Sequence, residues 1–281
     1  TSGPEQYEAA MRAVMACPEL VINDDDERGI QFTSQSIVSI EKRLTERAER
    51  MRATTGPAVS AQEQQSIIDA TPFNPGQREG FELLCSGKQL AVVNGAAGTG
   101  KSFVLAAMRK AYEKEGFTVY GAILQGKTAE DLQRDSGIQS RIIARMLLDL
   151  ENGKMKLNAK SVLVVDEAGM VGSRNLEKLM AYTEEAGARL RLVGDAKQLA
   201  AVEYGNAFVE VSKRAKVASL TEIMRQKTEW QRLASEKFSV HDIQGLQDYA
   251  DRGHVHLADT AQDAQIELVK AWSQHRAEQP E

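Results

Sequence analysis

The sequence predicts an α/β fold in which helices cover both faces of a parallel sheet. Between about residues 70 and 220, short apolar runs alternate with helical patterns, as in proteins whose parallel strands are joined by crossover helices. A glycine-rich loop directly follows the first apolar run, where phosphate-binding loops lie in sheets of this kind. The expected strands are Leu90–Asn94, Thr118–Ile123, Ser161–Asp166, Arg189–Gly194 and Val217–Leu220.

Residues 1–70 precede this alternation and are expected to form a small N-terminal accessory domain. Glu5–Ala16 has a short helical pattern, and the apolar runs on either side of the acidic segment 23–29 predict a hairpin. The stretch Thr54–Ser60 contains Gly-Pro and marks a boundary. We therefore expect that removal of residues 1 to about 60 leaves a foldable core.

A long helix is predicted over Gln35–Arg52, with one apolar face and with Thr33 or Ser34 as its N-cap. The other face carries basic residues with glutamates between them: Lys42, Arg43, Arg47, Arg50 and Arg52. Mixed charges of this kind are typical of a helix surface in contact with water. This face is therefore interpreted as solvated.

Residues 71–220 make up the α/β core domain, and residues 221–281 follow it as a helical extension or as the incomplete start of a second domain. In this last part, helical patterns replace the alternation. The expected helices are Lys227–Lys237, Asp242–Asp251 and Ala261–His275.

Composition restricts the classes of function. The net charge of −5 provides no overall attraction for DNA or an anionic membrane, so nucleic-acid binding requires a local basic surface. The chain has two cysteines, which make neither a disulfide framework nor a metal-ligand cluster. No apolar run approaches membrane-spanning length and no signal peptide is visible. We expect a cytoplasmic protein without membrane insertion.

The glycine-rich loop has the pattern Gly-x-x-x-x-Gly-Lys-Ser, from Gly95 to Ser102, between an apolar run and a helical pattern. Backbone N–H groups of such a loop point at phosphate oxygens, and the following helix N-terminus adds partial positive charge. Lys101 is expected to reach the β- and γ-phosphates, and Ser102 to hold Mg²⁺. The expected nucleotide-binding residues here are Gly95, Gly98, Thr99, Gly100, Lys101 and Ser102.

Two acids end the expected strand Ser161–Asp166, at the sheet edge where ligands bind. Asp166 is expected to hold Mg²⁺ through water, and Glu167 to act as the base that orients or deprotonates the attacking water.

Three further polar residues stand near the other elements of this site. Gln198 follows the strand Arg189–Gly194, and its amide can sense the γ-phosphate or the attacking water. Gln77 has the paired donor and acceptor that adenine recognition requires. Arg225 has the planar guanidinium that suits charge developing on a transferred phosphoryl group.

Six segments, in this order, resemble the motifs of a known family. They are NPGQREG, GAAGTGKS, GAILQGKTAEDL, DEAGM, VGDAKQL and LTEIMRQ. The set resembles superfamily-one DNA helicases of the RecD-like, 5′-to-3′ branch, and more narrowly the helicase region of conjugative relaxases of the TraA/TraI/TrwC kind. The upstream segment FTSQSIVSIEKRL is also similar to the region before the motor in these relaxases. The resemblance covers most of residues 30–281.

The resemblance implies a RecA-like P-loop NTPase domain that uses ATP and Mg²⁺ and moves on single-stranded DNA. It also implies that the partners are the rest of a larger relaxase polypeptide and other conjugation proteins. The later helicase motifs, which include a second arginine finger, have no counterpart here. We therefore expect an ATPase/DNA helicase fragment that by itself hydrolyses ATP slowly and unwinds no duplex.

DNA contacts are expected after the second strand. In the family, the segment GAILQGKTAEDL touches single-stranded DNA, which implies contacts by Lys127 and Thr128. Arg141 belongs to a basic stretch that follows. The segment Leu150–Leu157 has two interpretations: a small hairpin that splits a duplex, or a helix end at Gly153 with a polar connector, which we favour.

Two other functions use the same loop. A nucleotide or small-molecule kinase would need a basic lid, and the sequence shows no arginine-rich candidate. A non-catalytic nucleotide-binding or docking module is disfavoured by the presence of Lys101 and Glu167.

Overall fold

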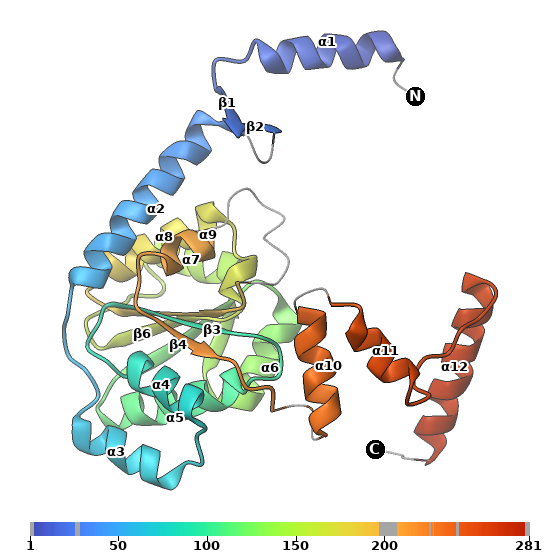
Figure 1. Ribbon diagram of the computed structural model, residues 1–281. Coiled ribbons are helices and arrows are strands. Elements are labelled where there is room, and N and C mark those ends of the chain that lie inside the picture. Colours follow the sequence, from blue (N-terminus) through green and yellow to red (C-terminus); the bar gives the residue numbers. More distant parts are fainter. Residues whose placement is uncertain are drawn as a thin grey trace. The chain divides into compact units, whose positions relative to one another are not determined.

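The computed structural model describes residues 3–25, 29–196, 207–224, 226, 228–239 and 242–278. Within them lies a parallel sheet of six strands in the order β5-β4-β6-β7-β3-β8 (Figure 1). Its strands are β3 (Leu90–Gly95), β4 (Thr118–Ile123), β5 (Gln139–Ile142), β6 (Ser161–Val165), β7 (Arg189–Gly194) and β8 (Val217–Leu220). The predicted α/β fold with a parallel sheet is confirmed.

Each of the five expected strands is present, with ends that differ by at most one residue. Buried parallel strands are continuous apolar runs, which makes them visible in a sequence. Strand β5 was not predicted. It lies at the edge of the sheet beside β4, and its residues are exposed or half-buried. Such a strand does not need an apolar run, and the sequence pattern therefore did not reveal it.

Helices cover both faces of the sheet, as expected for this fold (Figure 1). On one face, the core contains residues of α4 (Pro75–Leu84), α5 (Lys101–Lys114) and α6 (Gly126–Ser136), with α3 (Ala61–Ala70) packed against it. On the other face, it contains residues of α2 (Gln35–Ala53), α7 (Ile143–Glu151), α8 (Ser173–Glu185) and α9 (Ala207–Ser212).

The chain divides into two compact units, residues 1–224 and residues 225–281. The first unit also contains α1 (Pro4–Met15) and an antiparallel pair, β1 (Leu20–Asp25) and β2 (Gly29–Ser34). The helix and the hairpin predicted there are thus present. In the second unit, the described residues form α10 (Glu229–Ser239), α11 (Gln244–Ala250) and α12 (Ala261–Glu278). Separate functions for residues 1–70, 71–220 and 221–281 stay predictions.

Helix α2 belongs to the core of the first unit. Its N-cap is Ser34, whose side chain accepts a hydrogen bond from the backbone N–H of Ile37. Leu44, Ala48 and Met51 are buried in the same cluster as sheet residues of β3, β6 and β7. Removal of residues 1 to about 60 would expose this cluster to water. We therefore revise the expectation that such a truncation leaves a foldable core.

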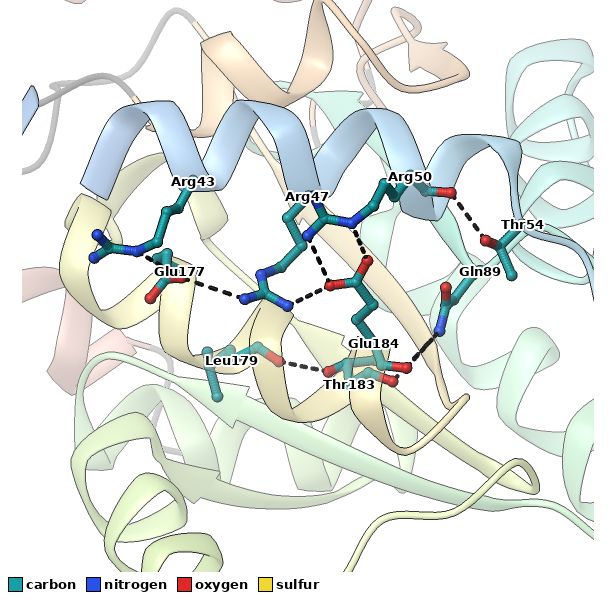
Figure 2. Close-up of polar contacts among 9 residues, drawn as sticks. All are labelled: Arg43, Arg47, Arg50, Thr54, Gln89, Glu177, Leu179, Thr183 and Glu184. Carbon is teal, nitrogen blue, oxygen red and sulfur yellow. Dashed lines mark hydrogen bonds and ion pairs between the residues drawn. The ribbon is translucent and has the colours of Figure 1, made fainter. Parts of the chain in front are cut away.

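The basic face of α2 forms ion pairs with α8, as Figure 2 shows. Arg47 bonds to Glu184 and lies 3.5 Å from Glu177, while the Arg50 Nε–Glu184 Oε1 distance is 2.9 Å. Burial acts to raise the pKa of Glu184, but bonds and charges of Arg50 and Arg47 outweigh it and hold that pKa below its usual value. The interpretation of this face as solvated is therefore wrong for Arg47, whose side chain is largely covered between α2 and α8. Arg43 and Arg50 stay exposed, although they also pair with glutamates of α8.

Leu44→Ala is expected to lower the free energy of unfolding by about 2–5 kcal/mol, the usual cost of removing a buried leucine side chain. Chemical denaturation followed by circular dichroism measures the change. The matched control is Val38→Ala on the exposed side of the same helix, for which we expect less than about 1 kcal/mol. Equal effects of the two substitutions would show that α2 is not a core element.

Candidate functional site

The expected motif residues meet at one edge of the sheet. Because the six strands are parallel, their carboxyl ends share that edge. The loop 96–100 leaves the end of β3 and enters α5 at Lys101, and Asp166 and Glu167 follow the end of β6. Ligands bind at the carboxyl ends of strands in sheets of this kind.

The loop needs its glycines for conformation and for space. Gly98 and Gly100 have φ angles of 83° and 84°, a region that residues with a side chain rarely adopt. A Cβ atom at Gly95 would lie 2.8 Å from Oγ1 of Thr99, and one at Gly100 would lie 2.5 Å from Nε2 of Gln77. The loop backbone therefore packs too closely to its neighbours for larger residues.

Lys101 begins α5 and folds back over the loop. Its ammonium group donates hydrogen bonds to the carbonyl oxygens of Gly95, at 2.7 Å, and Ala96, at 3.2 Å. The ammonium group is therefore a cation beside the loop backbone. A phosphate oxygen can replace either carbonyl oxygen as its hydrogen-bond acceptor. Ser102 is the next residue of the helix.

Gln77 connects α4 to the loop. It is buried, and it forms a capping box with Asn74, the N-cap of α4, in which each side chain accepts from the other residue's backbone N–H. Its Nε2 also donates to the carbonyl oxygen of Thr99, at 3.1 Å. The amide is thus already engaged with the protein backbone. Adenine recognition by Gln77 stays a prediction.

Asp166 is a half-buried carboxylate beside the loop. Burial raises the pKa of Asp166, while a hydrogen bond from the Glu167 N–H and the nearby charge of Lys101 act in the opposite direction. A carboxylate that is desolvated in this way, with a cation close by, suits a divalent metal ion.

Glu167 has an unusual backbone. Its φ and ψ angles are 51° and 38°, and among the described residues no other non-glycine has a positive φ. Conformations of this kind cost about 1–3 kcal/mol and concentrate at functional sites. Two residues further on, the chain passes close to the next strand: a Cβ atom at Gly169 would lie 2.9 Å from the carbonyl oxygen of Asp195, which follows β7.

Some of the expected site residues cannot be placed. Gln198 and Arg225 lie outside the described residues, and so do the side chains of Lys127 and Thr128. The backbone of the last two lies in the first turn of α6, directly after β4. Their roles stay predictions.

Arg141, expected from the sequence to contact DNA, forms an ion pair that the sequence analysis did not predict. Its guanidinium lies 2.9 Å from the carboxylate of Asp149, a buried residue of α7, and Arg145 contacts the same carboxylate. The spacing of four residues between Arg145 and Asp149 could have indicated this pair. The basic stretch is therefore partly neutralised, although Arg141 and Arg145 stay largely exposed.

Of the two interpretations of Leu150–Leu157, the helix end with a polar connector is confirmed. Helix α7 ends at Glu151, Gly153 has a φ of 67°, and the described residues 152–160 contain no strand.

Two residues beside the loop escaped the sequence interpretation. The backbone N–H of Met224 donates to the carbonyl oxygen of Gly98, at 2.7 Å. Phe103, in the first turn of α5, is exposed although it is a large apolar side chain. For Phe103, the signal available in the sequence was an aromatic residue directly after the glycine loop. For Met224, only the fold brings it to the loop.

Comparisons with known proteins show which proteins the chain is similar to. A family model described as "AAA domain" matches residues 72–260. Conjugal transfer protein TraA of Rhizobium radiobacter is 34% identical over 210 residues, which cover 73% of this chain and 19% of that protein. ATP-dependent RecD2 DNA helicase of Deinococcus radiodurans is 30% identical over 145 residues, 50% of this chain and 20% of that protein. The predicted resemblance to relaxases and RecD-like helicases is confirmed.

The chain spans about a fifth of the length of these curated relatives. Among solved structures, Pif1 helicase from Candida albicans is similar with a TM-score of 0.46 and 20% identity, over 60% of this chain and 44% of that chain. Among the helices that the structure describes, none combines the length and apolar character that crossing a bilayer requires.

Proposed function

The chain belongs to the AAA domain family, and from this premise we propose that it is the ATP-binding first motor domain of a DNA helicase or translocase within a conjugative relaxase. The observation that carries the proposal is the glycine loop between β3 and α5, with Lys101 at its mouth and the acids Asp166 and Glu167 on the same sheet edge. The relatives named for conjugal transfer and DNA unwinding support the choice of process.

In this proposal, the loop N–H groups and Lys101 hold the triphosphate of ATP. Ser102 and Asp166 are the residues that would hold Mg²⁺, which supplies positive charge to the phosphates when bound. The donor set fits, since a hydroxyl and a half-buried carboxylate are oxygen ligands of the kind that Mg²⁺ prefers. Because burial raises the pKa of Asp166, Mg²⁺ affinity should fall as the pH falls and the carboxylate becomes protonated.

Hydrolysis is assigned to Glu167, which would take a proton from the attacking water. Gln198 would sense the γ-phosphate, and Arg225 would stabilise charge on the transferred phosphoryl group. All three assignments rest on position along the chain and on the residue types.

The proposed substrate is single-stranded DNA, along which the motor translocates from 5′ to 3′ in the cytoplasm. The backbone of Lys127 and Thr128 lies in the first turn of α6, which follows β4 toward the same sheet edge as the loop. Arg141 lies in β5, which pairs with β4. Contacts of this kind to phosphates make affinity fall steeply with salt. The rest of a larger polypeptide and other conjugation proteins are the proposed partners.

The test is ATP turnover by the chain with and without single-stranded DNA. We expect a slow rate that DNA increases, with no such increase for Arg141→Ala if this residue contributes to the contact. A rate that responds to a small-molecule acceptor instead would favour a kinase. Binding of ATP without any turnover would favour a non-catalytic module.

Strand displacement from a duplex with a 5′ single-stranded tail is expected to be absent, even at saturating ATP. Unwinding needs two domains that hold DNA differently as ATP binds and leaves. The described residues of the second unit form the helices α10, α11 and α12 and contain no strand. Robust unwinding by these 281 residues would show that the class of motor is wrong.

A further inference from the structure

A buried aromatic ring lies beside the turn that follows Glu167. Phe208 belongs to α9, is 1% exposed, and lies in the same buried cluster as Ala168. Ala168 begins η1 (Ala168–Met170), a single turn of 3₁₀ helix whose N-cap is Glu167. The ring therefore packs, within the protein core, against the segment that carries the proposed base.

Two glycines leave the space that this ring fills. A Cβ atom at Gly169, in η1, would lie 3.9 Å from Cδ1 of Phe208, and one at Gly194, which ends β7, would lie 3.2 Å from its Cζ. The glycines also approach each other, since a Cβ atom at Gly194 would lie 3.0 Å from the backbone nitrogen of Gly169. One ring thus lies against both the turn after β6 and the end of β7.

The backbone of Glu167 explains why such support matters. Its φ of 51° belongs to a conformation that persists only where the surroundings over-determine it. Two hydrogen bonds act within the turn: the Glu167 N–H donates to the Asp166 carboxylate, and the Glu167 carbonyl oxygen accepts from the Met170 N–H, both at 2.9 Å. These bonds shape the turn without fixing it against β7. The packing of Phe208 supplies that second constraint.

Helix α9 is itself held against α2. Phe208 and Val211 of α9 are buried in the same cluster as Leu44 of α2. Nε of Arg214, two residues after α9, lies 3.6 Å from Oε1 of Glu49 on α2. The position of α9 in the core is therefore set by a helix outside the sheet, and the ring passes that position on to the turn.

On this basis, and resting on the proposed function, we infer that Phe208 is a positioning residue for ATP hydrolysis: it holds the turn so that the Glu167 carboxylate faces the attacking water. Because Phe208 is buried, it contacts neither nucleotide nor water and acts only through Glu167. A displacement of about 1 Å can lower a rate by about 10²-fold. Loss of the ring should therefore slow the chemical step and leave nucleotide binding unchanged.

The experiment measures the initial rate of ATP turnover by the whole chain against ATP concentration, with Mg²⁺ and single-stranded DNA present. Phe208→Leu keeps an apolar side chain but is too short to fill the space at both glycines. We expect kcat to fall by about 10- to 100-fold. The KM, and the dissociation constant of Mg-ATP from calorimetric titration, should stay within about twofold of their values for the unchanged chain.

The matched control is Phe117→Leu. Phe117 is also a buried phenylalanine, but it directly precedes β4, at the opposite edge of the sheet, and packs edge-on against Tyr112 with ring centres 5.0 Å apart. This substitution should lower the melting temperature about as much as Phe208→Leu does, and should leave kcat within about twofold of the unchanged chain.

A second probe keeps the inference testable if Phe208→Leu misfolds. The φ of Gly194 is not positive, so its backbone accepts alanine. The added Cβ atom would push against the ring of Phe208 and the backbone of Gly169. Gly194→Ala is therefore expected to lower kcat with an unchanged KM.

A double-mutant cycle separates positioning from a general weakening of the fold. If Phe208 acts through Glu167, its replacement has nothing further to remove once the carboxylate is gone. In the Glu167→Gln background, Phe208→Leu is therefore expected to change turnover by less than about twofold.

The inference would be overturned by a loss of kcat in Phe208→Leu no larger than in Phe117→Leu, or by equal losses with and without the Glu167 carboxylate. A raised KM with unchanged kcat would place Phe208 in nucleotide binding instead. Failure of the proposed function looks different: the unchanged chain would not hydrolyse ATP, or Glu167→Gln would hydrolyse it at the unchanged rate. Either result would also remove the reaction that Phe208 is inferred to support.

Discussion

Glu167→Gln is expected to lower the rate of ATP turnover by about 10²–10⁴, the typical contribution of general-base catalysis, while ATP still binds. The amide has nearly the same shape as the carboxylate but cannot accept the proton of the attacking water. Glu167 also holds a left-handed backbone at the end of β6, so replacement by a residue of equal length separates the loss of the base from a change of conformation.

Single-turnover hydrolysis of ATP, with binding measured separately by titration, tests this expectation. The control is Glu113→Gln on the outer part of α5, where the carboxylate pairs with Arg109. A Glu167→Gln rate within about threefold of the unchanged chain would remove Glu167 from the role of base. The base would then have to be sought among the acids that follow the neighbouring strands, such as Asp195.

Lys101→Ala is expected to abolish measurable hydrolysis and to weaken Mg-ATP binding by at least tenfold, since a hydrogen bond to a charged group contributes about 1.5–3 kcal/mol. In the structure, the ammonium group of Lys101 bonds to two loop carbonyl oxygens, which phosphate oxygens can replace. Without it, the triphosphate would face those carbonyl oxygens with no cation between them.

A second effect distinguishes Lys101 from an ordinary surface cation. Its charge opposes the rise of the pKa of Asp166 that burial causes. Loss of Lys101 should raise that pKa further, so Mg-ATP affinity should fall at a higher pH than in the unchanged chain. Titrations across a pH series measure this shift. Lys110→Ala, an exposed lysine of the same helix, is the matched control, and an unchanged Mg-ATP affinity in folded Lys101→Ala would refute the nucleotide site.

Much of the site was predictable because its chemistry is local in sequence. The loop from Gly95 to Ser102 carries its own conformational requirement in its glycines, and Asp166 and Glu167 end an apolar run that could only be a buried strand. The contacts of Gln77 and the approach of Met224 were not predictable. They join residues 22 and 126 positions from their partners, Thr99 and Gly98, and no local pattern encodes such a distance.

The sequence by itself determined which segments are strands and which are helices, wherever burial imposes a continuous apolar run or an apolar face. Tertiary structure alone decided the order β5-β4-β6-β7-β3-β8 and the inclusion of β5. Strand β5 is identified only by its pairing with β4, since none of its residues is buried, whereas β8 at the other edge has two buried residues and was predicted.

For charged residues too, the sequence determines the residue type and the tertiary structure decides its surroundings. Arg191 interrupts the apolar run of β7 but is fully buried, and it donates to the carbonyl oxygens of Leu84 and Ser86 and to the hydroxyl of Tyr112. The arginines of α2 face Glu177 and Glu184 more than a hundred residues away. A sequence shows that a side chain is charged, but the cost of burying that charge depends on partners that only the folded chain brings within hydrogen-bonding distance.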